Sequence, residues 1–115
     1  MPSASAPKEV RLQIEPAELS AWRAAGSPLQ ILDVREPWEV ALCGLSGAVN
    51  LPLGQLPGRF GELDRGRPLV VLCHHGARSM QAVKWLRAQG YDQAINLAGG
   101  IDAWARTVEP GMATY

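Results

Sequence analysis

The chain has 115 residues, of which 47% are hydrophobic, and its 11 Lys and Arg residues balance its 11 Asp and Glu residues. This length and hydrophobic content are those of one ordinary domain that can form a core without disulfides. The zero net charge gives no support for a nucleic acid or an acidic membrane as a partner, and no apolar run approaches the length that crosses a bilayer.

The cysteine content and the amino terminus indicate the cellular compartment. Two cysteines are too few for a disulfide framework, and the segment from Met1 to Pro7 lacks the basic start and apolar core of a secretory signal peptide. We therefore expect a cytoplasmic protein. The composition predicts a flexible leader over 1–7, one folded domain over 8–110 and a C-terminal tail over 111–115.

The first half of the chain shows alternating apolar residues, a proline followed by carboxylates at a helix start, and short apolar runs bounded by turn residues. The predicted elements are an edge strand over 10–14, a helix from Pro16 to Gly26, strands over 29–34 and 48–51, and an irregular helix or turn over 53–63. Trp38 is interpreted as a packed aromatic residue.

The second half begins with Leu69 to Leu72, an unbroken apolar run that is typical of a strand buried on both faces. A helical pattern follows from Ser79 to Gly90, then a strand over 94–97 and a helix from Gly100 through Ala105. Strands that alternate with helices predict an α/β fold. We expect a central parallel sheet of about five strands with helices on both faces.

Cys73 stands where a buried strand ends and a short loop leads into a helix. Backbone N–H groups of such a loop, together with the helix dipole, favour an anion at this point. Arg78, five residues further on, adds a fixed positive charge. The pattern therefore favours Cys73 as an ionised nucleophile, and the alternative is that Cys73 only closes a buried strand.

The stretch Cys73-His74-His75-Gly76-Ala77-Arg78-Ser79 resembles the active-site loop of the rhodanese family. Three further stretches, at 33–39, 47–53 and 96–104, are similar to other signatures of that family and occur in the same order. The chain departs from the family at 43–48, where Cys-Gly-Leu-Ser-Gly-Ala replaces a common Gly-His-Ile-Pro-Gly-Ala string. In the family that position supports the fold, so the departure leaves the implied chemistry unchanged.

The resemblance implies a rhodanese-like domain and a sulfurtransferase. Such an enzyme moves a sulfane sulfur from a donor such as thiosulfate to a thiophilic acceptor through a persulfide on Cys73, without a metal or an organic cofactor. Its implied partners are a small-molecule donor and acceptor, with a sulfur-carrier protein as a further candidate. The implied substrate-binding residues are His74, His75, Gly76, Ala77, Arg78 and Ser79, with Asp33 and Arg35 in support.

Several of these residues have a more detailed expectation. Arg78 is expected to bind the donor oxygens through paired hydrogen bonds, because guanidinium offers a planar fork. Asp33 and Arg35 end a strand at the sheet edge where ligands bind in open α/β folds, and we expect them chiefly to hold loops in place. Cys43 is expected to be dispensable, because no cation stands near it in the sequence.

His74 and His75 could suggest a metal site with Cys73. Adjacent side chains tend to point apart, however, and no distant Cys or His pair completes a tetrahedral set. We therefore interpret both histidines as solvent-facing loop residues, either of which could contact substrate or adjust the local charge.

Two other functions stay open at this point. A cysteine phosphatase or arsenate reductase also combines a cysteine and an arginine at a helix start, but typically with five residues between them, whereas four stand between Cys73 and Arg78. A catalytically silent binding module of the same fold is disfavoured by the presence of Cys73. The segment 112–115 is either a frayed tail or an apolar flap near the site.

Overall fold

A computed structural model describes residues 11–115, so the predicted leader and the start of the first predicted strand lie outside the described residues. The strands are β1 (Gln13–Ile14), β2 (Gln30–Asp33), β3 (Val49–Asn50), β4 (Leu69–Leu72) and β5 (Ala94–Leu97). The helices are α1 (Pro16–Ala24), α2 (Pro37–Leu42), α3 (Leu56–Arg59), α4 (Ala77–Ala88) and α5 (Gly100–Thr107). Two 3₁₀ turns, η1 (Leu53–Gln55) and η2 (Phe60–Glu62), flank α3, as the irregular pattern there predicts.

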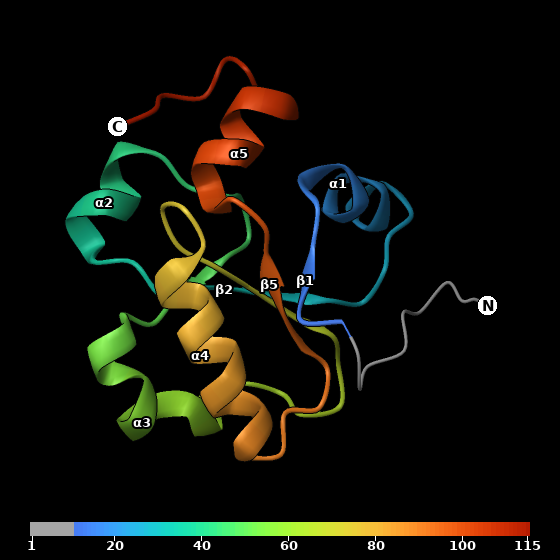
Figure 1. The fold of residues 1–115 in the computed structure, drawn as a ribbon, viewed down its shortest axis with the longest axis vertical. Helices are drawn as coiled ribbons and strands as arrows, with labels where there is room; N and C mark the ends of the chain where they lie inside the picture. The colour runs from blue at the N-terminus through green and yellow to red at the C-terminus, as the bar shows by residue number, and fades with distance from the viewer. Residues whose placement is uncertain (1–10) are drawn as a thin grey trace.

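The five strands form one parallel sheet in the order β1-β5-β4-β2-β3, which confirms the predicted α/β class (Figure 1). The central strand β4 is buried along its whole length, in agreement with its unbroken apolar run. Because all the strands are parallel, their carboxyl ends share one edge. Asp33 at the end of β2 is the register partner of Leu72 at the end of β4, so the residues that follow both strands start close together.

Helices cover both faces of the sheet (Figure 1). One apolar cluster joins the sheet to α3 and α4, and a second joins it to α1 and α5. In the first cluster Val83 and Leu86 of α4 pack with Val71, and in the second Leu19 and Trp104 pack with Val70. Successive residues of β4 therefore face opposite layers, as the two-residue period of a strand requires.

The structure contains a helix that the sequence reading missed. The start of α2 has the same arrangement as the start of α1: a capping glutamate, then a proline, and a second glutamate three residues after the cap. The carboxylate of the second glutamate accepts a hydrogen bond from the backbone N–H of the capping glutamate. Trp38 on α2 is 64% exposed, so its interpretation as a packed residue is wrong. Its ring makes a T-shaped contact with that of Tyr115, with centroids 6.3 Å apart.

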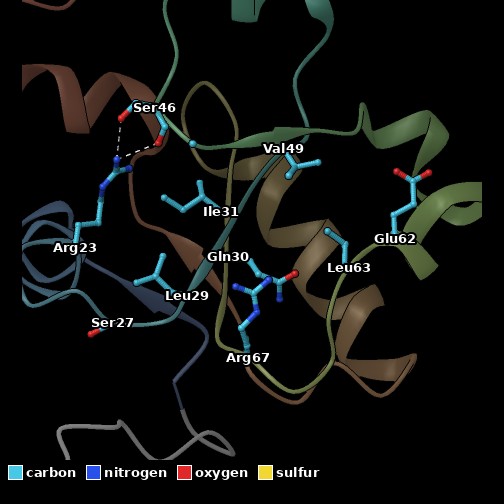
Figure 2. Close-up of a pocket in the computed structure, with 11 residues that line it drawn as sticks. Arg23, Ser27, Leu29, Gln30, Ile31, Ser46, Val49, Glu62, Leu63 and Arg67 are labelled. Carbon is cyan, nitrogen blue, oxygen red and sulfur yellow. Dashed lines mark hydrogen bonds between the residues drawn. The ribbon is translucent and has the colours of Figure 1, made fainter.

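A pocket of about 430 Å³ lies near the amino-terminal end of β2 (Figure 2). Gln30, the first residue of β2, lines it together with Arg23 and Arg67. Since Cys73 follows the carboxyl end of the neighbouring strand β4, this pocket is separate from the predicted nucleophile. Among the described residues, no helix is long and apolar enough to cross a membrane.

Candidate active site

Cys73 follows β4 directly, is 1% exposed, and has two backbone N–H donors and one hydroxyl around its sulfur. The backbone N–H of Gly76 lies 3.1 Å from Sγ, and the backbone N–H and the hydroxyl of Ser79 lie 3.4 and 3.3 Å away. The amino terminus of α4 points at the same atom. Backbone donors and a helix terminus aimed at one sulfur stabilise negative charge there, and the loop thus has the geometry of an anion site.

The shape of this loop depends on Gly76 and on a buried amide in the next strand. Gly76 has a φ of 109°, a conformation that residues with a Cβ rarely adopt. It caps α4, which begins at Ala77, two residues earlier than predicted. Asn96 on β5 donates to the carbonyl of Gly76 at 3.3 Å, and its Oδ1 contacts the Ser79 hydroxyl. Asn96 was not singled out from the sequence, where its only signal is a polar residue inside an apolar strand.

The start of α5 holds the carbonyl side of the same loop. The N–H groups of Ile101 and Asp102 donate to the carbonyls of Cys73 and His74 at 2.9 and 3.1 Å. A Cβ on Gly100 would lie 2.5 Å from both of those carbonyl oxygens. Only glycine permits this close approach, which explains the glycine at the first position of α5.

Arg78 is paired with a carboxylate that the sequence did not point to. Its Nη1 and Nη2 each donate to one carboxylate oxygen of Glu39 at 2.8 Å. These hydrogen bonds raise the pKa of Arg78, and they lower the pKa of Glu39 from 4.5 to about 2 although burial opposes the change. Arg78 thus lies at the loop as predicted, but its fork is occupied. Ala77, the remaining loop residue, is exposed at the start of α4.

The low pKa of Glu39 predicts a pH-dependent contribution to stability. Because its pKa is lower in the folded than in the unfolded chain, ionised Glu39 stabilises the fold above pH 4.5, and this contribution is lost as the pH falls toward about 2. Wild type should therefore exceed Glu39→Gln in free energy of unfolding by up to about 3 kcal/mol at neutral pH. Urea unfolding at a series of pH values should show this difference shrinking below pH 4.5, and a constant difference would contradict the assignment.

Asp33 and Arg35 form a buried ion pair beside the loop. Both are at most 1% exposed, and Arg35 Nη2 and Nε donate to the Asp33 carboxylate at 2.7 to 3.1 Å. Arg35 also donates to the carbonyls of Glu39 and Cys43 at 3.3 and 2.8 Å. Burial opposes charge on Arg35, but hydrogen bonds with Asp33 and Tyr115 raise its pKa. Arg35 thus links Asp33 at the end of β2 to the middle of α2 and to the residue that follows it, and the supporting role of the pair stays a prediction.

The C-terminal segment lies over this site. It passes from α5 to the side of α2 (Figure 1), where the Tyr115 hydroxyl accepts from Arg35 at 3.0 Å and donates to Glu39 at 2.9 Å. The Tyr115 ring stacks on His74 with centroids 3.9 Å apart and an interplanar angle of 7°. The sequence left open whether this segment is a frayed tail or an apolar flap near the site. The contacts of Tyr115 are those of a flap.

His75 faces solvent, as interpreted from the sequence, whereas His74 does not, and the two side chains do not point apart. Their rings stack with centroids 3.9 Å apart, His75 is exposed, and His74 is half-buried under Tyr115. Possible ligand atoms of both histidines and Asp102 lie within 4.8 Å of one another. Arg106 already binds the Asp102 carboxylate at 2.9 Å, and no fourth ligand joins this group in the described part of the chain. The three side chains therefore make an incomplete metal site.

Cys43 ends α2 and is half-buried. Arg35 Nη1 lies 4.0 Å from its sulfur, so the argument that no cation stands near Cys43 is wrong. A small pocket is lined by both Cys43 and His74, which places the second thiol close to the nucleophile loop. Over residues 11–115, however, no backbone N–H donates to the Cys43 sulfur, in contrast to Cys73. That Cys43 is dispensable stays a prediction.

Comparisons with known proteins agree with this geometry. The model of the rhodanese-like domain family matches residues 15–107. A protein named sulfurtransferase from Allochromatium vinosum is 39% identical over 101 residues, which cover 88% of this chain and 94% of that protein. The putative sulfur carrier protein YrkF of Bacillus subtilis is 36% identical over 81 residues, or 70% of this chain and 44% of YrkF. The crystal structure of a rhodanese-related protein from Thermoplasma volcanium matches with a TM-score of 0.78 and 32% identity, over 85% of this chain and 94% of that one.

Proposed function

Because the chain belongs to the rhodanese-like domain family, we propose that it transfers a sulfane sulfur from a small-molecule donor such as thiosulfate to a thiophilic acceptor through a persulfide on Cys73. A sulfurtransferase function in general is supported by its relatives. The donor, the acceptor and the persulfide are our proposal. The observation that carries it is the pair of backbone N–H donors, of Gly76 and Ser79, within 3.4 Å of the Cys73 sulfur.

The reaction has two steps. The Cys73 thiolate attacks the outer sulfur of thiosulfate, a new S–S bond forms, and the old S–S bond breaks with its electron pair leaving on sulfite. The product is a persulfide anion on Cys73. A nucleophilic acceptor such as cyanide then attacks the terminal sulfur, takes it as thiocyanate, and returns the electron pair to the Cys73 thiolate.

The loop is suited to both forms of the nucleophile. The N–H groups of Gly76 and Ser79 point at Sγ when the cysteine carries no added sulfur. A persulfide moves the negative charge outward by one bond, to an atom next to the same loop and the start of α4. Donors that are already oriented stabilise this charge without reorganising, which is the electrostatic contribution expected of such a loop.

Intact-mass analysis tests the proposal directly. After incubation with thiosulfate and removal of excess donor, the protein should gain the mass of one sulfur atom, and peptide mapping should place this atom on Cys73. Addition of cyanide should remove the added mass and release thiocyanate. A protein that gains no sulfur from any sulfane donor would contradict the proposed function.

A sulfur-carrier protein is a further candidate acceptor. YrkF, a putative sulfur carrier, contains a region similar to most of this chain. We also propose a cytoplasmic location, which is supported by two cysteines that are both free. A reducing compartment keeps such thiols available for sulfur transfer.

A further inference from the structure

The carboxylate of Glu39 is fixed against Arg78 by four hydrogen bonds. Two come from the Arg78 guanidinium at 2.8 Å, one from the Tyr115 hydroxyl at 2.9 Å, and one from the backbone N–H of Glu36 at 2.9 Å. Glu39 is 4% exposed, so little water competes for its oxygens. Paired guanidinium–carboxylate hydrogen bonds are among the stronger ones in proteins, particularly where water is excluded. Glu39 therefore occupies the Nη1–Nη2 side of the Arg78 guanidinium and compensates its charge.

The second guanidinium beside the loop is occupied as well. Arg35 is buried against Asp33, with Nη2 and Oδ2 2.7 Å apart, and gives its remaining donors to carbonyls of α2 and to Tyr115. Each of the two arginines is thus matched by one carboxylate. A third carboxylate, that of Asp102, lies 3.9 Å from His75 on the loop. The N–H groups around Cys73 stabilise a single negative charge, and the charge of each guanidinium beside the loop is already compensated by a carboxylate.

We propose that Glu39 determines the donor specificity of this site: by occupying Arg78 it makes the enzyme favour singly charged sulfane donors, such as thiosulfonates, over the dianion thiosulfate. This inference rests on the proposed sulfur transfer through Cys73. A dianion that approaches Arg78 meets a guanidinium whose charge Glu39 already compensates, so its second charge gains little there. A monoanion with an organic group has one charge fewer to compensate and brings apolar surface to Trp38 and Tyr115 beside the site.

Two donors that differ mainly in charge allow a direct test. With benzenethiosulfonate, the Cys73 thiolate attacks the terminal sulfur, the S–S bond breaks, and benzenesulfinate leaves with the electron pair. With thiosulfate the same bond breaks and sulfite leaves. Both reactions form the same persulfide on Cys73, so cyanide can serve as the acceptor in both assays. The measured quantity is the ratio of kcat/KM for thiosulfate to kcat/KM for benzenethiosulfonate.

Glu39→Gln is the principal variant. Glutamine retains an acceptor for the N–H of Glu36 and suits this position of the capping box, but it no longer neutralises Arg78. A hydrogen bond to a charged group typically contributes more than a kcal/mol, so the donor ratio should rise about tenfold toward thiosulfate, mainly through a lower KM. Glu62→Gln is the matched control, because it removes a carboxylate from an exposed pair with Arg59 and should leave the ratio unchanged.

A double variant, Glu39→Gln with Arg78→Gln, keeps the test decisive if the single variant does not fold. It replaces an ion pair by two neutral amides that can bond to each other, and the charge beside Cys73 matches that of wild type. Its donor ratio should equal the wild-type ratio. A ratio that falls about tenfold in the double variant would show that Arg78 binds thiosulfate in spite of Glu39, and the inference would be wrong.

The outcomes also separate this inference from the proposed function. If both donors load sulfur onto Cys73 and Glu39→Gln leaves their ratio unchanged, the specificity role of Glu39 is overturned while sulfur transfer stands. If neither donor loads sulfur onto the wild-type protein, the proposed function itself fails. A rise in the ratio for Glu39→Gln alone, with no change in Glu62→Gln and in the double variant, would support the inference.

Discussion

Replacement of Cys73 by serine is expected to lower kcat/KM for sulfur transfer from thiosulfate to cyanide by at least about a thousandfold. Serine fits the same space and can accept from the N–H groups of Gly76 and Ser79, so the loop should keep its structure. Its hydroxyl is a far weaker nucleophile than a thiolate, and it cannot hold a transferable sulfane sulfur. The variant should therefore fold, retain its melting temperature within a few degrees, and gain no sulfur mass after treatment with a donor.

The matched control is Cys43→Ser, which removes the only other thiol of the chain. It should keep most of the wild-type activity and gain one sulfur atom, because the persulfide forms at Cys73. If the Cys43 variant lost most of its activity while remaining folded, the second thiol would have to act as a relay or a resolving group. If the Cys73 variant remained active, the proposed mechanism would be wrong.

The largest loss of stability is expected for Arg35→Leu. This change leaves the buried Asp33 carboxylate without its guanidinium and removes the hydrogen bonds to the carbonyls of Glu39 and Cys43. Breaking a buried ion pair from one side costs about 3–5 kcal/mol, because the remaining charge stays buried and uncompensated. We expect a loss of this size in the free energy of unfolding, measured by urea denaturation at neutral pH.

Arg59→Leu supplies the comparison, because Arg59 pairs with Glu62 at a similar distance on the surface. Exposed pairs contribute at most about 1 kcal/mol, so this variant should stay close to wild type. Adding Asp33→Asn to Arg35→Leu should recover part of the loss, since it neutralises the uncompensated carboxylate. Equal effects of Arg35→Leu and Arg59→Leu would show that the buried pair does not hold α2 in place.

The predicted parts of the site come from patterns that lie close together in the sequence. The apolar run of β4, the cysteine after it and the helical spacing of α4 lie within 69–88, and their contacts form between neighbours in the chain. The N–H groups of Gly76 and Ser79 are near the Cys73 sulfur in sequence, and tertiary contacts from Asn96 and the start of α5 then fix the loop. The α/β class could likewise be predicted, because strand and helix periods alternate along the chain.

The start of α2 carries a local sequence signal that is also present at the start of α1. Glu36, Pro37 and Glu39 repeat the arrangement of Glu15, Pro16 and Glu18, which did predict the start of α1. The same pattern therefore indicates α2. Trp38 next to that proline then falls in the first turn of a short surface helix. Its exposure could have been inferred from this position.

What the sequence by itself determined is the fold class and the order of strand, cysteine, loop and helix around Cys73, since each depends on residues near one another or on the period of apolar side chains. The tertiary structure alone decided which charges meet. Arg78 and Glu39 are 39 residues apart and Tyr115 and Glu39 are 76 residues apart, and nothing in their spacing selects these partners from the other charged residues. They meet because parallel pairing aligns the carboxyl ends of β2 and β4, which brings α2, the loop after β4 and the C-terminal segment to one edge of the sheet.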